Sequence, residues 1–340
     1  MDKAVLRDLG REKFGKFCRV CNTCDGVACA GEIPGMGGVL TGRSFQNNIM
    51  ALRDVLLRQR IVHSAGNPDT GCEVFGVKMA APVIAAPIGG ISYNLNDFTP
   101  EGDYARSIVA GAAQSGCLGM TGDGGPEIIY RSGIEAITEA GGRGIPTIKP
   151  RPNRDIIRQA ETAARAGAPA VAADIDSAAL INMTRLNQPV GPKTEREIAE
   201  LAKEIKLPLI IKGVMTVEDA KASLAAGAAG IVVSNHGGRV LDHTPGTAMA
   251  LPEIARAVKG KMAVWVDGGV RTGVDVLKML ALGADAVLVG RPFAQAAAGG
   301  ANGVAFAFAA MIDQLKMAMI MTGASKLADI DGSFIYRREK

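Results

Sequence analysis

The chain has 340 residues, 48% hydrophobic and 21% charged, a balance typical of folded globular proteins and not of disordered chains. Its net charge is +4, and residues 1–60 account for all of it, with ten Lys or Arg against six Asp or Glu. The remaining residues are electrically neutral. Nucleic-acid binding needs a concentrated basic face, so this distribution argues against nucleic acid as a partner.

Four of the six cysteines, Cys18, Cys21, Cys24 and Cys29, lie within twelve residues near the N-terminus. The charged stretch before them has no apolar run of the kind found in secretory signals, so we expect a cytoplasmic protein. Clustered cysteines in that compartment more often bind metal or carry redox chemistry than form structural disulfides. Their spacing predicts a metal site, either zinc or iron–sulfur, with free or redox-active thiols as the alternative.

The segment 44–62 has apolar residues on one face and predicts a helix. Because no low-complexity linker separates this segment from the rest of the chain, we divide the protein into a Cys-rich N-terminal extension (1–40) and one large domain (41–340). Within that domain, eight short runs of Val, Ile, Leu and Ala end in Gly, Asn, Asp or Pro. They lie at 82–90, 116–122, 145–150, 170–176, 207–213, 230–237, 262–269 and 286–293.

Continuous apolar runs of this kind are typical of parallel strands that are covered on both faces. Helical spacing of apolar residues lies between them, at 156–166, 194–205, 217–226, 248–258 and 272–282. The alternation predicts an α/β fold, a (β/α)8 TIM barrel, with the helix at 44–62 closing its bottom. The apolar stretch 301–321 contains Asp313 and Lys316, which predicts a packed helix and not a membrane span.

Catalytic groups of such barrels lie at the C-terminal ends of the strands. Glycine-rich turns with Arg271 and Arg291 follow the last two runs and predict a phosphate site. His236 follows the sixth run, and Arg239 three residues later has a guanidinium that suits a carboxylate. Proton removal from a 2-hydroxy acid requires a base whose pKa is near neutral, beside a group that binds the carboxylate of the acid.

Two further strand ends carry ionisable side chains. Lys212 is interpreted either as a Schiff-base nucleophile or as a fixed positive charge beside an electron-accepting ring. Asp174 and Asp176 are two residues apart on one predicted strand and therefore point the same way. One of them is expected to orient His236 and stabilise its imidazolium form.

Three runs carry a family resemblance: IIKGVMTVEDA (210–220), VSNHGGRVLD (233–242) and VDGGVRTGVDVLKMLALGADAVLVGRP (266–292). They resemble the FMN-dependent α-hydroxy acid oxidase and dehydrogenase family, which includes glycolate oxidase, lactate oxidase and mandelate dehydrogenase. The resemblance implies oxidation of a small 2-hydroxy acid, lactate-like or glycolate-like, to the 2-oxo acid, with flavin N5 as electron acceptor. It also implies a homo-oligomer, a tetramer in the family.

The resemblance also implies roles for individual residues. His236 is the active-site base and Asp176 its partner, Arg239 binds the substrate carboxylate, and Lys212 stabilises the reduced flavin. The residues implied to hold FMN, mainly its phosphate, are Ser234, Asp267, Gly268, Gly269, Arg271, Gly290 and Arg291. Those implied to line the isoalloxazine ring are Pro87, Ile88, Gly89 and Thr121.

Part of the family's substrate site is missing. All four tyrosines lie after residue 92, so the family's tyrosine before the barrel is absent. The family's Gln-x-Tyr is replaced by Ile148-Lys149-Pro150, its second substrate arginine is absent from 178–181, and Asp174 replaces a threonine that touches the flavin. Tyr93 and Lys149 are candidates to supply a lost donor.

Two alternative functions arise from these departures. One is an FMN-dependent isomerase of the type 2 isopentenyl diphosphate isomerase kind, which shares barrel and cofactor. The other is a non-enzymatic redox sensor that uses flavin or metal. The substrate side chain stays open, as does the electron acceptor, which is oxygen, a quinone or a protein.

Overall fold

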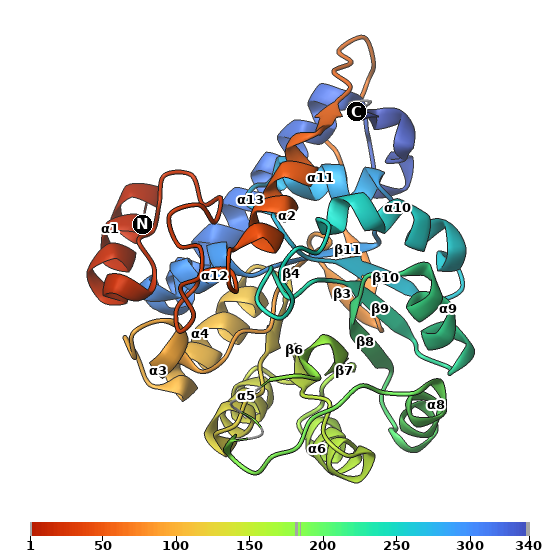
Figure 1. Ribbon diagram of the computed structural model, residues 1–340. Helices are drawn as coiled ribbons and strands as arrows, with labels where there is room; N and C mark the ends of the chain where they lie inside the picture. The colour runs from red at the N-terminus through yellow and green to blue at the C-terminus, as the bar shows by residue number, and fades with distance from the viewer. Residues whose placement is uncertain (1, 181–182, 184, 338–340) are drawn as a thin grey trace.

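A closed barrel of eight parallel strands forms the centre of the computed structural model, which describes residues 2–180, 183 and 185–337 (Figure 1). The order around the barrel is β10-β11-β4-β5-β6-β7-β8-β9. The strands are β4 (Val83–Ala85), β5 (Leu118–Thr121), β6 (Gly144–Ile148), β7 (Val171–Asp174), β8 (Leu209–Val214), β9 (Gly230–Val233), β10 (Ala263–Val266) and β11 (Ala286–Val289). Each falls within or overlaps one predicted run, so the predicted TIM barrel is confirmed.

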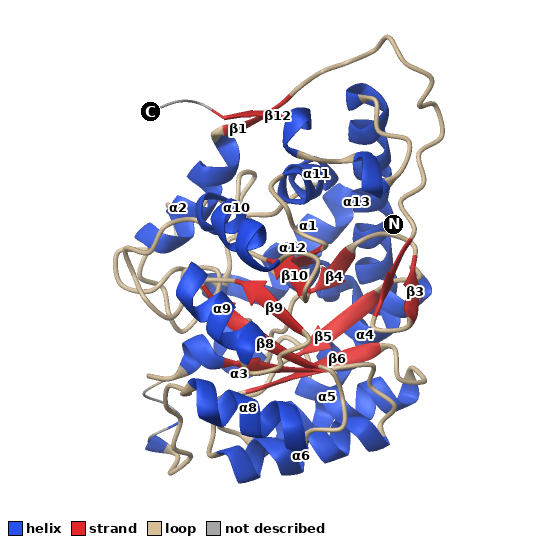
Figure 2. Ribbon diagram, turned by 90° about the vertical axis from the view of Figure 1, so that its right-hand side faces the viewer, coloured by secondary structure: helices blue, strands red, loops and turns tan. Residues whose placement is uncertain are grey.

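Helices cover the outside of the barrel, as Figure 2 shows. They are α4 (Glu101–Gln114), α5 (Glu127–Glu139), α6 (Asn153–Arg165), α8 (Glu195–Glu204), α9 (Val217–Ala225), α10 (Thr247–Val258), α11 (Gly273–Ala281), α12 (Arg291–Ala296) and α13 (Gly300–Thr322). Because both faces of each strand are covered, the barrel strands are almost entirely buried, which explains their continuous apolar sequence. Thr194 and Glu197 form a capping box at the start of α8.

The helix predicted at 44–62 is shorter and lies elsewhere. It is α2 (Arg43–Arg53), and the chain continues into β1 (Val55–Leu57), which pairs with β12 (Ile335–Arg337). α2 packs on the loop after β9, where Asn48 Nδ2 donates to Asn235 Oδ1 and Ser44 Oγ donates to the Leu241 carbonyl. It therefore lies at the C-terminal ends of the strands, and the prediction that it closes the bottom was wrong.

The opposite end of the barrel is covered by a hairpin of β2 (Cys72–Val74) and β3 (Val77–Met79). The ring of Phe75 at its turn lies 5.7 Å from the ring of Trp265, between centroids. Phe75 also approaches Gly230, the first residue of β9. Apolar contact with the starts of the strands thus closes this end.

The N-terminal extension lies at the barrel mouth. It begins with α1 (Lys3–Phe14), which buries Leu6 and Phe14 and packs against α12. The chain then crosses the ends of the strands beside α12 (Figure 1), and the Val39 amide donates to the Gly238 carbonyl over 2.9 Å. The division at residue 40 remains a prediction, because these contacts join the extension to the barrel.

The stretch Arg291–Thr322 is long and apolar enough to cross a membrane by length and composition alone. In the structure α13 packs against α4 and α11 and buries Phe308, Met311 and Leu315. A packed helix was predicted here, and this packing accounts for its apolar sequence.

Candidate active site

A cavity of about 730 Å³ opens at the C-terminal ends of the barrel strands. Of the predicted catalytic residues, His236, Arg239 and Lys212 line it. Pro87, Ile88 and Gly89, predicted to contact the flavin ring, line it as well. The predicted phosphate residues that line it are Asp267, Gly268, Gly269, Arg271, Gly290 and Arg291. Residues from segments that are distant in sequence therefore meet at one site.

Two residues predicted to bind the cofactor do not face the cavity. Thr121 turns toward α5, where a Cβ on Gly133 would lie only 2.5 Å from its Oγ1. Thr121 therefore packs against a helix and does not line the flavin site. Ser234 is fully buried, and its hydroxyl donates to Asp267 Oδ2 over 2.9 Å, so it supports Asp267 from behind.

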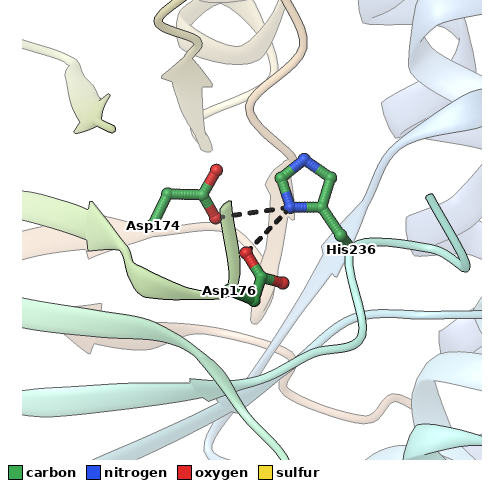
Figure 3. Close-up of side chains that lie close together, drawn as sticks. All are labelled: Asp174, Asp176 and His236. Atoms are coloured by element: carbon green, nitrogen blue, oxygen red, sulfur yellow. Dashed lines mark hydrogen bonds and ion pairs between the residues drawn. The ribbon is translucent and has the colours of Figure 1, made fainter. Parts of the chain in front are cut away.

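His236 is held by a carboxylate. Its Nδ1 lies 2.9 Å from Asp176 Oδ1 and 3.6 Å from Asp174 Oδ1. Figure 3 shows the other ring nitrogen pointing away from both carboxylates. A proton on Nδ1 then donates to Asp176, which leaves Nε2 unprotonated and able to act as a base.

Asp174 is the centre of a buried ion-pair network. Its Oδ2 accepts from Lys149 Nζ over 2.6 Å, and its Oδ1 accepts from Lys212 Nζ over 2.9 Å. Burial opposes the charge of Asp174, but His236, Lys149 and Lys212 together lower its pKa well below the ordinary value. Lys149 is thus held by Asp174 and Ser177 at the cavity wall, and its role as a replacement substrate donor stays a prediction.

Lys212 carries a fixed positive charge. Burial alone lowers its pKa, but Asp174, Asp176 and Asp267 outweigh burial and raise the pKa above the ordinary value. A Schiff-base nucleophile needs a neutral amine, so this environment contradicts that interpretation of Lys212 and favours a permanent cation beside a ring that gains negative charge.

Each terminal nitrogen of Arg239 makes a hydrogen bond within the protein, and these bonds use only part of its five N–H donors. Nη1 donates to the carbonyl of Gly35 over 2.6 Å, and Nη2 donates to Asn94 Oδ1 over 2.7 Å. Burial lowers its pKa to about 10, which still leaves it charged at neutral pH. Arg239 thus lies at the cavity wall as predicted and also fastens the N-terminal extension. Its contact with a substrate carboxylate stays a prediction.

Arg271 and Arg291 are cations at the turns after β10 and β11. Arg291 donates to the carbonyls of Met36, Gly37 and Gly237, and Arg271 Nε donates to the Cys24 carbonyl. Arg271 Nη2 is buried without a partner, and among the described residues neither arginine contacts a carboxylate. Burial and the nearby Arg271 lower the pKa of Arg291 to about 9.

This arrangement fits FMN. Two enclosed cations without a counter-charge need an anion, and glycine-rich turns supply backbone N–H groups for a phosphate. A Cβ on Gly290 would meet only Ile88 and Ala86, at 3.6 and 3.8 Å, so the cavity beside this glycine is open. Asp267 Oδ1 is buried close to Lys212 and has no hydrogen-bond partner. It can accept a hydrogen bond from a ring N–H or a ribityl hydroxyl of FMN.

Several cavity residues were not predicted from the sequence. Ile33, Pro34 and Met36 of the N-terminal extension line the cavity, as do Arg185 and Leu186 beyond β7. Arg185 lies a few residues beyond the stretch 178–181, where the family's second substrate arginine is absent. The sequence did contain a signal for the contact between the N-terminal extension and the cavity. The glycines around Met36 permit a close approach of the backbone to the barrel.

The cysteine sulfurs do not lie at the mutual distances that a zinc site, one of the two predicted metal sites, requires. Among the described residues, the only three potential ligand atoms within 4.8 Å of one another belong to Asp174, Asp176 and His236. These three side chains already form the hydrogen-bonded pair and ion-pair network of the active site. All six cysteines are free.

Comparisons with known proteins agree with this site. The FMN-dependent dehydrogenase family model matches residues 36–193 and 181–337. Glycolate oxidase 1 of Zea mays is 32% identical over 330 residues, covering 84% of this chain and 86% of that protein. L-lactate dehydrogenase of a Caulobacter species is 30% identical over 365 residues, covering 89% of this chain and 93% of that protein. A solved mandelate oxidase with 2-hydroxy-phenylacetamide has a TM-score of 0.80 at 28% identity, covering 98% of this chain and 97% of that chain. This chain belongs to the FMN-dependent dehydrogenase family.

Proposed function

We propose that the protein oxidises a small 2-hydroxy acid to the 2-oxo acid with FMN as its cofactor. The observation that carries this proposal is the hydrogen bond from His236 Nδ1 to Asp176, which prepares Nε2 as a base inside the cavity. Relatives named glycolate oxidase and L-lactate dehydrogenase support the substrate class. An isomerase has no need for a base paired with a carboxylate-binding arginine, so the oxidoreductase function is favoured.

In this mechanism, Arg239 holds the substrate carboxylate at the cavity wall. His236 Nε2 accepts a proton from the substrate, and the resulting imidazolium is stabilised by Asp176 and by Asp174 behind it. When bound, FMN supplies the two-electron acceptor. Lys212 keeps a positive charge at the floor of the site, where it offsets the negative charge that accompanies reduction.

The cavity walls indicate the kind of substrate. Ile33, Met36, Leu186 and Val240 line it with apolar groups, while Lys212, Arg239 and Arg185 are among its charged groups. A 2-hydroxy acid whose side chain is short and apolar, as in lactate, satisfies both regions. Larger aromatic side chains are the second class to test, since a mandelate oxidase shares the fold.

The test is an anaerobic titration of the purified FMN-loaded protein with a panel of 2-hydroxy acids. Flavin absorbance is expected to bleach with one or more of them, and His236→Ala is expected to abolish bleaching while FMN stays bound. His243→Ala is the matched control, because this histidine lies in the same loop with its side chain 72% exposed. Failure of every acid to bleach the flavin would favour the isomerase or the redox sensor instead.

We also propose that the protein acts in the cytoplasm as a homo-oligomer. Support for an oligomer comes from exposed apolar side chains around β1, including Leu56, Ile61 and Val62, with Met321 hydrogen-bonded through its carbonyl to Arg60. Light scattering of the purified protein, compared with Val62→Lys, measures the assembly directly. A monomer in both cases contradicts the proposal.

A further inference from the structure

A second pocket lies beside the active site and is lined by Cys18, Cys21, Cys24 and Cys29, with Phe17 and Phe45 among its walls. Cys18 is buried and the other three are half-buried. The Nε2 of Gln295 donates to Cys18 Sγ over 3.5 Å. Four free thiols from one short loop thus converge on one pocket, which the proposed oxidation mechanism does not use.

The loop that carries the cysteines is fixed to the barrel. Arg271 Nε donates to the Cys24 carbonyl over 3.1 Å, and Arg291 Nε donates to the Met36 carbonyl over 2.9 Å. The Arg291 guanidinium also lies over the Phe45 ring, 3.6 Å from its centroid. The loop that carries the cysteines is therefore fixed against the barrel and is not a free arm.

The charge of this region favours an anionic group. Arg291 lines the cysteine pocket, and within the described part of the chain it has no carboxylate partner. Buried cations are stable only when a counter-charge compensates them. Four thiolates around a metal centre supply negative charge on the side of Arg291 that faces away from the active-site cavity.

The separation of the sulfurs favours an iron–sulfur cluster over zinc. The two-residue spacing of the first three cysteines is shared by zinc sites and cluster-binding runs, so the separation of the sulfurs decides between the two. Zinc would draw its four sulfurs to about 3.8 Å from one another, given Zn–S bonds of about 2.3 Å. In the part of the chain that the structure describes, no three cysteine sulfurs lie within 4.8 Å of one another. A [4Fe–4S] cluster needs wider spacing, because each thiolate binds a different iron at a corner of a cube.

The two pockets share a wall. Arg291 and Met36 line both the active-site cavity and the cysteine pocket, so a single layer of side chains separates them. This proximity allows electrons to pass from one site to the other. It also explains why the extension is fastened by the same arginines that face the cofactor site.

We propose that Cys18, Cys21, Cys24 and Cys29 ligate a [4Fe–4S] cluster that carries electrons from the active site to a small one-electron carrier protein. The relay rests on the proposed function. Oxidation of one 2-hydroxy acid to the 2-oxo acid releases two electrons and two protons. The cluster accepts and passes on one electron at a time, so two successive cluster reductions reduce two carrier molecules for each substrate. The protons leave through His236 to solvent.

The first experiment determines the cofactor in the full chain purified without oxygen. We expect about four iron and four sulfide ions per chain, and an electron paramagnetic resonance signal after reduction with dithionite. Cys21→Ser/Cys24→Ser is expected to lose iron, sulfide and signal, while bound FMN and the circular dichroism spectrum show that the barrel is folded. Cys72→Ser, in the distant β2–β3 hairpin, is the matched control and is expected to keep all three. One zinc without sulfide, or no metal, overturns the proposal.

The second experiment tests the relay separately from the proposed function. A 2-hydroxy acid that bleaches the flavin is added without oxygen, and the cluster signal is expected to appear. His236→Ala is expected to give the signal with dithionite but not with the acid. A bleached flavin beside an oxidised cluster overturns the relay and leaves the proposed function intact. A signal with dithionite, but neither bleaching nor signal with any acid, upholds the cluster and contradicts the proposed function.

Discussion

His236 and Asp176 are joined by a 2.9 Å hydrogen bond between Nδ1 and Oδ1, although they follow different strands, β9 and β7. The backbone of His236 adopts a left-handed conformation with φ 58°, and its amide donates to Ser234 Oγ over 3.0 Å. This strained turn directs the imidazole across the mouth toward Asp176. Strain of this kind persists where the surrounding structure compensates for it, and it is typical of active sites.

Replacing Asp176 with Asn is expected to slow flavin reduction by the substrate about 100-fold or more. The amide does not stabilise an imidazolium, and it leaves the tautomer of His236 undefined. Stopped-flow absorbance under anaerobic conditions measures the rate. Asp219→Asn, on the exposed first turn of α9, should leave the rate unchanged. Equal rates for both variants would exclude Asp176 from the mechanism.

Replacing Lys149 with Met is expected to destabilise the protein by about 3 kcal/mol. The change removes the bonds from Nζ to Asp174 and Ser177 and leaves the buried carboxylate with Lys212 as its main partner. Urea unfolding at neutral pH measures the free energy of unfolding. The exposed Lys206→Met serves as the control, and a loss no larger than in this control would show that Lys212 alone compensates Asp174.

Replacing Thr121 with Val is expected to leave FMN affinity unchanged. The Thr121 hydroxyl is buried without a partner and lies against Gly133, so Val removes an unsatisfied group and raises stability by about 1 kcal/mol. Gly290→Val is the opposing case, because its side chain would enter the cavity and should weaken FMN binding. Fluorescence titration with FMN compares the two. A tenfold loss of affinity in Thr121→Val would place the hydroxyl at the flavin after all.

Replacing Asp242 with Asn is expected to cost about 2 kcal/mol at neutral pH. Burial opposes the charge of Asp242, but bonds from Thr41, the Ser44 amide and the His243 amide lower its pKa below the ordinary value. These bonds join the N-terminal extension and α2 to the loop after β9.

A carboxylate with a lowered pKa stabilises the folded state above its unfolded pKa of about 3.9, and the stabilisation disappears as the pH falls through the folded value. The difference between Asp242→Asn and the unmodified protein should therefore be constant from pH 7 to 5 and shrink below pH 4. Urea unfolding at each pH measures it. The exposed Asp313→Asn should show no such dependence, and a constant difference down to pH 3 would assign the effect to packing.

The barrel was predictable from local pattern, whereas Asp176 as the partner of His236 was implied by the family resemblance. Buried parallel strands leave continuous apolar runs in any sequence, and the barrel then brings all strand ends to one mouth. Two parts of the prediction failed for one reason. The amphipathic pattern of α2 and the position of Thr121 after an apolar run show that these residues are buried, but neither shows which neighbour covers them.

The role of Asp174 also needed the fold. Its place two residues before Asp176 predicted a shared direction, and both carboxylates do approach His236. The strand, however, ends at Asp174, and a 3-10 turn (Ile175–Ser177) follows, which frees Asp174 to pair with Lys149 and Lys212. Neither lysine is near Asp174 in sequence, so no local pattern contains this network.

The amino-acid sequence alone predicted the barrel, a phosphate site at its last two strands and a metal at the four cysteines, and the family resemblance implied FMN. The position of those cysteines beside Arg271 and Arg291 came from the fold. Contacts such as Arg271 to Cys24 span 247 residues and leave no periodic trace in the chain. They form because buried guanidinium groups must find acceptors, and the carbonyls of the N-terminal extension lie within reach only after the barrel has closed.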